Sequence, residues 1–248
     1  MTTRTQPDST TSAYPRRWLA LALLGTAQFM LILDVTVVAI ALPQMEADLA
    51  LSREALTWVV AAYTVTFGGL MLLGGRSADL FGAKRIVYSG LLTFVAGSLA
   101  AGFADSGTVL LAGRIAQGIG AAMLSPAALS VVVRLFEGDE RNRALGIWSA
   151  LGGGGAAVGV LLGGLITAGP GWPWVFFINV PVGAIVLIGL LRVLPPLPPQ
   201  PGARARLDFL GAVLVTGATG LAIGPYPRFL DTGCDYAAVG SVAARRAS

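Results

Sequence analysis

The feature that most constrains this chain is a run of 48 residues, Ala144 to Leu191, that contains no charged side chain. A soluble domain has roughly 25% charged residues, so a stretch of this length is not compatible with an aqueous surface. The whole chain follows the same pattern, with 55% hydrophobic and 12% charged residues. These values indicate a membrane protein rather than a soluble one.

The composition also excludes several kinds of chemistry. The chain has no histidine, and its single cysteine is Cys234. Disulfide frameworks, Cys/His metal sites and histidine-dependent catalytic triads are therefore excluded, and we expect no enzyme activity, no metal and no bound cofactor. The net charge of +4 is more typical of a basic cytoplasmic membrane face than of nucleic-acid binding, so we expect no nucleic-acid partner.

Several apolar stretches are long enough to cross a bilayer, which takes about 20 residues. Charged residues separate most of them, and the two prolines and two glycines of residues 169–173 divide the long uncharged run into two crossings. The predicted spans are Trp18–Leu42, Ala55–Gly75, Ile86–Ala104, Ser106–Val133, Ala144–Thr167 and Trp174–Leu191.

The basic residues outside these spans lie almost entirely on one side when the loops are labelled alternately. Twelve lysines and arginines fall on the side of the N-terminus, and only Arg53 falls on the other. Because cytoplasmic loops carry the excess of basic residues, we expect a multi-pass protein of the cell (inner or plasma) membrane with a cytoplasmic N-terminus.

The spans and the segments around them define a predicted domain organisation. It consists of a cytoplasmic tail (1–17), a six-helix transmembrane bundle (18–194), a proline-rich cytoplasmic linker (195–207), a partial seventh span (208–224) and an atypical tail (225–248). The apolar pattern stops abruptly after residue 224, which leaves a truncated chain as one interpretation of the sequence.

Two charged residues lie inside predicted spans. Asp34 is eight residues from Leu42, the outer end of the first span, and Arg114 is eight residues from Ser106, the outer end of the fourth. At 1.5 Å per residue, both lie about 12 Å below the outer surface, so equal depth permits mutual contact. A charge near the middle of a bilayer costs at least about 2.5–3.5 kcal/mol on insertion scales, which favours a function for both residues.

We therefore expect Asp34 and Arg114 to take part in proton coupling, with a purely structural ion pair as the alternative. Burial disfavours a charged carboxylate, whereas a neighbouring arginine favours it. A carboxyl group held between these opposing effects can bind and release a proton as its exposure changes.

The loop between the second and third spans, residues 75–85, holds one acid among three cations. It resembles the loop signature of the major facilitator superfamily, G-x-L-a-D-r-x-G-r-k. The resemblance implies a conformational-switch loop, and the alternative is a tight basic turn that only orients the chain. The residues concerned are Gly75, Arg76, Asp79, Gly82, Lys84 and Arg85.

Three further segments resemble motifs of the same superfamily. Residues 110–122 are similar to l-x-x-x-R-x-x-q-G-x-g-a-a, which links Arg114 to proton transfer. Residues 33–43 and 172–183 resemble l-D-x-T-v-v-n-v-A-l-P and W-R-W-i-F-l-i-N-v-P-i-G, two motifs of the fourteen-helix drug:proton antiporter group (EmrB/QacA type). The four motifs occur in the order and spacing of that group, and they correspond to its N-terminal half only.

A fifth segment, residues 155–164, is similar to the antiporter motif g-x-x-x-G-P-x-x-G-G, with Val160 in place of the proline. The resemblance implies an antiporter-motif helix that carries Gly155, Gly159, Gly163 and Gly164. The alternative is a glycine-rich face that lets a neighbouring helix approach closely.

The family resemblance implies an all-α membrane protein, whose six-helix bundle consists of two inverted three-helix repeats, followed by a partial seventh transmembrane helix. It implies proton-coupled efflux of drugs or other hydrophobic or cationic small molecules, with the proton gradient as energy source. The partners would be the lipid bilayer, a small-molecule substrate and either a second bundle or another copy of the chain. The alternative is a truncated, transport-inactive membrane fragment of such a transporter. The candidate substrate-cavity residues are Gln28, Phe29, Met30, Trp58 and Tyr63.

Overall fold

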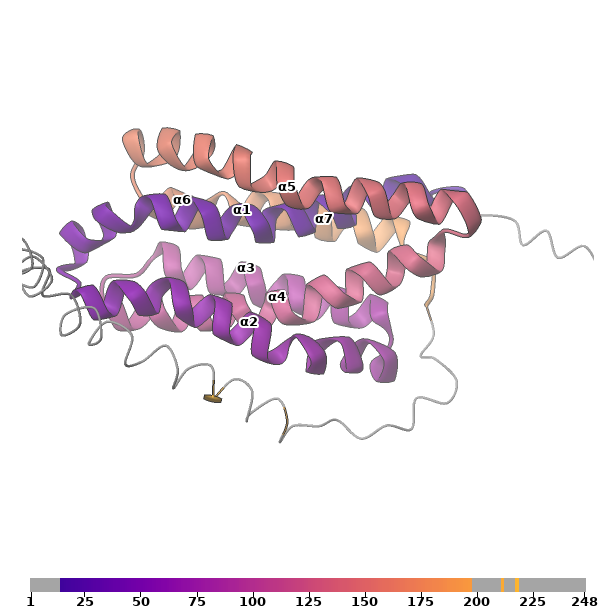
Figure 1. Cartoon of the computed structure of the whole chain (residues 1–248), viewed down its shortest axis with the longest axis horizontal. Helices are drawn as coiled ribbons and strands as arrows, with labels where there is room; N and C mark the ends of the chain where they lie inside the picture. The colour runs from indigo at the N-terminus through magenta and orange to yellow at the C-terminus, as the bar shows by residue number, and fades with distance from the viewer. Residues whose placement is uncertain (1–13, 198–210, 212–216, 219–248) are drawn as a thin grey trace, which may run out of the picture.

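The computed structural model describes residues 14–197, 211 and 217–218. The predicted N-terminal tail up to residue 13, most of the proline-rich linker, most of the partial seventh span and the whole atypical tail thus lie outside the described residues. The main described range, 14–197, contains seven α-helices (Figure 1). They are α1 (Arg17–Leu49), α2 (Arg53–Phe81), α3 (Ala83–Gly102), α4 (Gly107–Leu135), α5 (Gly138–Ala168), α6 (Pro173–Phe177) and α7 (Asn179–Val193).

These helices supply six candidate membrane spans in the described part of the chain, because α6 and α7 together form the sixth. The six predicted crossings and the break at residues 169–173 are therefore confirmed. The helices are longer than the apolar runs: α1 continues through Pro43 to Leu49, and α5 begins at Gly138 rather than Ala144. Hydropathy marks the bilayer-embedded part of a helix, whereas charged residues can extend the helix beyond it. Asp139 and Glu140, for example, lie in the first turn of α5, where acidic side chains favour helix formation.

The bundle has two layers (Figure 1). One layer holds α1, α5, α6 and α7, and the other holds α2, α3 and α4. Helix α4 packs closely against α2 and α3, whereas α1 packs mainly against α5. The first helix of each predicted three-helix repeat therefore packs against helices of the other repeat, so the repeats interlock.

Glycines let α4 touch its neighbours at the level of the backbone. A Cβ atom on Gly74 of α2 would lie 2.0 Å from the Ala122 carbonyl oxygen, and one on Gly120 of α4 would lie 2.4 Å from the Phe94 amide nitrogen of α3. Small residues at such contacts are the usual means of close helix packing in membranes. Helix α4 is consequently clasped between α2 and α3.

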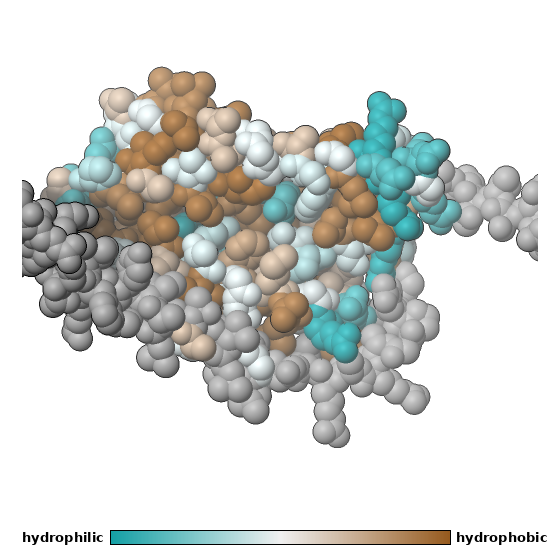
Figure 2. All heavy atoms as spheres, viewed as in Figure 1, coloured by the Kyte–Doolittle hydropathy of each residue, from teal (hydrophilic) through white to brown (hydrophobic). Residues whose placement is uncertain are grey.

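Charged residues separate to the two ends of the bundle. Figure 2 shows hydrophilic side chains gathered where α5 begins, beside a mainly apolar middle. Among the described residues, the end that holds the start of α1 carries nine cations and four acids, and the opposite end carries Arg53 and four acids. The molecule thus has a basic end, an apolar belt and an acidic end.

Candidate functional site

Asp34 of α1 and Arg114 of α4 meet inside the bundle, and both residues are 0% exposed. Arg114 Nη1 donates a hydrogen bond to Asp34 Oδ2 at 2.5 Å, so the contact that equal depth permits is present. The other carboxylate oxygen, Asp34 Oδ1, accepts from Gln117 Nε2 at 2.9 Å and from Asn179 Nδ2 at 3.0 Å. Three donors therefore converge on one fully buried carboxylate.

The guanidinium of Arg114 is held from several sides. Its Nε donates to the Val59 carbonyl oxygen of α2 at 3.0 Å, and its Nη1 also donates to Gln117 Oε1 at 2.9 Å. The guanidinium carbon lies 4.5 Å from the centroid of the Tyr63 ring, which is a cation–π arrangement. These contacts leave the arginine little freedom to leave Asp34.

Ser98 of α3 completes the polar network. Its Oγ accepts from Gln117 Nε2 at 2.8 Å and from Asn179 Nδ2 at 3.3 Å. The network thus joins α1, α2, α3, α4 and α7 and crosses the boundary between the two layers. Among the described helices, α5 and α6 contribute no hydrogen bond to it.

Glycines explain why these polar groups come within reach of one another. A Cβ on Gly97, next to Ser98, would lie 2.7 Å from the backbone nitrogen of Gln117, and one on Gly118 would lie 2.8 Å from the Tyr63 carbonyl oxygen. The backbones of α3 and α2 therefore approach α4 directly beside the network. The small residues of residues 110–122 have this geometric consequence whatever the transport direction.

The hydrogen bonds around Asp34 match the ionised form of its carboxyl group. An ionised carboxylate can only accept hydrogen bonds, and Asp34 receives three. A buried ion pair is stable only when the remaining donors and acceptors are also satisfied, which Ser98, Gln117 and Asn179 achieve here. Addition of a proton to Asp34 would weaken the charge interaction with Arg114 and require the surrounding donors to rearrange.

Three members of the network have no role in the sequence predictions. Gln117 and Asn179 belong to segments that resemble family motifs, but within these segments the resemblance assigns a function only to Arg114. The available signal was their amide side chains inside otherwise apolar spans. Ser98 offered no such signal, because a serine in a helix commonly bonds its own backbone, as Ser89 does with the Ile86 carbonyl oxygen.

The predicted conformational-switch loop is a very tight connection. Helix α2 ends at Phe81 and α3 begins at Ala83, with Gly82 between them at φ +93°, a conformation that glycine adopts readily. Lys84 Nζ donates to the Leu194 carbonyl oxygen at 2.7 Å, just after α7. In the described part of the chain, no salt bridge includes Asp79, Arg76 or Arg85, so a charge network in this loop stays a prediction. Gly75 lies against Pro126 of α4, where a Cβ would have 3.6 Å of separation.

Three of the four glycines predicted for the antiporter-motif helix face α1. A Cβ on Gly155, Gly159 or Gly163 would lie 3.0 Å from Ile32, 2.8 Å from Thr36 or 2.9 Å from Ile40, respectively. A Cβ on Gly164 would meet no described atom within 4 Å. The geometry fits the packing-face alternative for α5, and the role of these glycines in antiport stays a prediction.

The five candidate cavity residues occupy different environments. Tyr63 and Met30 are buried, at 1% and 4% exposed, and Tyr63 packs against Arg114. Gln28 and Phe29 are partly buried; the Oε1 atom of Gln28 is buried without a hydrogen-bond partner among the described residues. Trp58 lies on α2 nearer the acidic end than Tyr63, five residues before it.

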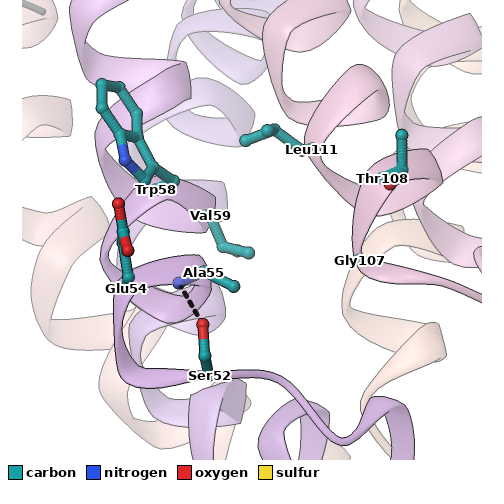
Figure 3. Close-up of a pocket in the computed structure, with 8 residues that line it drawn as sticks. All are labelled: Ser52, Glu54, Ala55, Trp58, Val59, Gly107, Thr108 and Leu111. Atoms are coloured by element: carbon teal, nitrogen blue, oxygen red, sulfur yellow. Dashed lines mark hydrogen bonds between the residues drawn. The ribbon is translucent and has the colours of Figure 1, made fainter. Parts of the chain in front are cut away.

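Trp58 lines a cavity of about 390 Å³ between the first turns of α2 and α4 (Figure 3). Val59 also lines this cavity, and its carbonyl oxygen is the one that binds Arg114 Nε. Val59 is therefore in contact with both the cavity and the buried network. The other lining residues are Ser52, Glu54, Ala55, Gly107, Thr108 and Leu111.

Six membrane-length helices around a buried acid–guanidinium network define a polytopic membrane protein with an ionisable centre, and such centres mark ion and substrate pathways. The comparison with known families is more specific. Residues 24–235 match the Major Facilitator Superfamily, and the chain belongs to this family.

Similar curated proteins are antibiotic resistance and export proteins. The chain is 48% identical to the puromycin resistance protein of Streptomyces alboniger, over 82% of this chain and 40% of that protein. It is 44% identical to the cephamycin export protein of Amycolatopsis lactamdurans (83% and 43%) and 41% identical to the methylenomycin A resistance protein of Bacillus subtilis (81% and 42%). The chain thus spans about two fifths of the length of these relatives, whose names agree with the resemblance to drug:proton antiporters.

A solved structure of the peptide transporter POT has the same fold, with a TM-score of 0.63 and 19% sequence identity. The match covers 82% of this chain and 45% of that one. It confirms the all-α fold of the family's six-helix bundle.

Proposed function

We propose that this chain is the proton-coupling bundle of an efflux transporter for drugs or other hydrophobic or cationic small molecules. The names of the similar proteins support export as the direction and small molecules as the cargo. The proton gradient supplies the energy, and no cofactor takes part. The basic end of the bundle supports a cell-membrane protein with a cytoplasmic N-terminus.

The observation that carries this proposal is the complete burial of Asp34 among three hydrogen-bond donors. In the outward-facing state Asp34 takes up a proton, reorientation of the bundle carries it inward, and its release allows a new substrate molecule to bind. Arg114 competes with the proton for the carboxylate, so protonation and ion-pair formation exclude one another.

The cavity beside Trp58 supports proton entry from the acidic end. Val59 lines it, and the Val59 carbonyl oxygen accepts from Arg114. A water-filled path from this cavity would reach Asp34 once Arg114 is displaced from these contacts. Glu54 at the rim adds a negative charge that attracts cations, including protons.

A second bundle or another copy of the chain completes the transport path in this proposal. Helix α5 supports the need for such a partner, because only 17% of the residues in its most apolar 18-residue segment are buried. Val160, Leu161 and Leu165 are exposed on it, in addition to the glycines that meet no neighbour. The alternative is a truncated, transport-inactive fragment that inserts into the bilayer without moving substrate.

The test uses the 248-residue chain in proteoliposomes with an imposed proton gradient and ethidium, a hydrophobic cation, as the probe. We expect ethidium-dependent proton flux, and we expect Asp34→Asn to lower it by at least about tenfold, because an amide cannot carry the proton. Glu46→Gln is the matched control, since Glu46 is an exposed acid on the same helix. Unchanged flux in Asp34→Asn would sink the assignment of the proton site.

A second experiment separates the transporter from the inactive fragment. Flux through the 248-residue chain would eliminate the fragment alternative. If the chain shows none, sequencing of the DNA downstream of codon 224 shows whether further apolar spans follow in another frame. The Asp34→Asn and Glu46→Gln variants are then compared in the restored protein.

A further inference from the structure

Asn179 is an uncharged polar residue that is almost completely buried beside the carboxylate of Asp34. It is 1% exposed, it is the first residue of α7, and its Nδ2 atom donates to both Asp34 Oδ1 and Ser98 Oγ. It is also the residue through which the span formed by α6 and α7 bonds to the carboxylate. These contacts connect the carboxylate of Asp34 to α7, in addition to α1, α2, α3 and α4.

The hydrogen-bond pattern around Asp34 fits only the ionised carboxylate. The groups that bond to it are all donors: Arg114 Nη1, Gln117 Nε2 and Asn179 Nδ2. A protonated carboxyl group has an O–H that needs an acceptor. The network must therefore change at one or more of these groups when Asp34 takes up a proton.

Asn179 is the group best placed to supply that acceptor. The Oε1 atom of Gln117 already accepts from Arg114, and Ser98 Oγ already accepts from two amides. None of the hydrogen bonds among the described residues uses Asn179 Oδ1. Rotation of the Asn179 amide by half a turn would present this oxygen to the new O–H of Asp34.

The helix is interrupted next to Asn179. Ile178 interrupts the helix between α6 and α7, and Pro181 has no amide hydrogen for the carbonyl group four residues earlier.

We infer that Asn179 is a positioning residue for proton coupling, which stabilises Asp34 in its ionised form and turns its amide to accept a hydrogen bond once the carboxyl is protonated. The proton comes from bulk solvent and stays on Asp34 as an O–H, so no other reactant takes part. This inference rests on the proposed function, in which Asp34 is the proton carrier.

The groups that face Asp34 can be listed for each neighbouring helix. They are Tyr63 and the Val59 carbonyl from α2, Ser98 from α3, Arg114 and Gln117 from α4, and Asn179 from α7. Arg114 is the only charged side chain among them, so Asn179 is a donor that can be removed without a change in local charge.

The test measures protonation directly and does not need transport. Infrared difference spectra of the purified 248-residue chain in lipid nanodiscs, recorded over a pH series, contain the C=O band of buried protonated carboxyl groups. Asp34→Asn identifies the Asp34 band by removing it. The midpoint pH of that band is then compared between the unmodified chain and Asn179→Leu.

We expect Asn179→Leu to move the midpoint to higher pH by about one unit, the effect of losing one hydrogen bond to a charged group. The shift is upward because a bond to the ionised form is about twice as strong as the bond to the neutral form that is lost with it. Asn142→Leu, at an exposed position near the start of α5, is the matched control and should leave the midpoint unchanged.

Asn179→Ser covers the case in which the leucine variant does not fold, because the short hydroxyl side chain stays polar but cannot span the same distance. The same upward shift is expected. A folded variant at residue 179 with an unchanged midpoint would overturn the inference, as would an Asp34 carboxyl that does not titrate. Normal flux in Asp34→Asn would instead overturn the proposed function, so the two failures are distinguishable.

Discussion

Helices α4 and α5 are both long and rich in glycine, yet they differ in how deeply they are buried and in what their glycines contact. In the most apolar 18-residue segment of each helix, 56% of the residues are buried in α4 and 17% in α5. The glycines of α4 meet backbone atoms of both α2 and α3, whereas those of α5 meet mainly side chains of α1, on one face only; the exception is Gly163, where a Cβ would lie 3.2 Å from the Val37 Cα. Glycine content alone therefore does not distinguish a central helix from a peripheral one.

The difference has a mechanical meaning. Backbone contact leaves no side chain that could rotate to relieve a collision, so α4 is fixed to α2 and α3. Contact between a glycine and the flexible side chain of Ile32 or Ile40 can adjust by rotamer changes. We therefore expect α5 to slide or tilt against α1 more easily than α4 can move within its layer.

The largest effect is expected where two backbones touch. Gly74→Ala would place a Cβ 2.0 Å from the Ala122 carbonyl oxygen and should destabilise the bundle by about 3 kcal/mol, the upper part of the usual overpacking range. Thermal unfolding in detergent, followed by tryptophan fluorescence, measures the loss. Gly68→Ala, on the same helix with no described atom within 4 Å, should leave the transition unchanged; equal losses in both variants would refute the clasp around α4.

A smaller effect is expected at the contact between α1 and α5. Gly159→Ala would bring a Cβ to 2.8 Å from the Cβ of Thr36, and it should cost about 1–2 kcal/mol because α5, which packs on one face only, can shift slightly away from α1. Gly164→Ala, which meets no described neighbour, is the control and should be neutral or slightly stabilising, since alanine is the better helix former. A loss at Gly159 that matches that of Gly74→Ala would remove the distinction between the two helices.

The smallest effect is expected at the ion pair that joins the starts of α1 and α5. Arg17 Nε and Nη2 donate to the two carboxylate oxygens of Glu140 at 2.9 and 2.8 Å, but this pair is only partly buried, and ion pairs near the surface contribute little and are screened by salt. Arg17→Gln should lower the melting temperature slightly at low salt and not at all in molar salt. The control is Arg16→Gln, which loses a single 3.4 Å bond to the Arg192 carbonyl oxygen; a large, salt-independent loss in Arg17→Gln would contradict this ranking.

The sequence was most informative where a residue conflicted with its surroundings. Asp34 and Arg114 were predictable because a charge inside an apolar span requires a partner, and the helical rise placed both at one depth. The spans themselves followed from hydropathy and from Gly169 to Pro173. The family motifs then predicted the fold, which the structural comparison bears out.

Other features depend on which neighbour a helix meets, and hydropathy contains no such information. Gly163 and Gly164 look equivalent in the sequence, but adjacent residues point about 100° apart on a helix, so one faces α1 and the other does not. Ser98 causes no conflict in an apolar span, and its role depends on the close approach of α3 to α4. The packing of α1 and α4 against helices of the other repeat likewise depends on tertiary contacts rather than on the local sequence pattern.

The buried pair also has a consequence for how the protein is made. Asp34 leaves the ribosome 80 residues before Arg114, so α1 reaches the membrane with an acid that has no basic partner yet. The ion pair can form only after α4 has been made, so α1, the first helix to be synthesised, gains this contact well after its own synthesis. The contact that we assign to proton coupling therefore forms late in the assembly of the bundle.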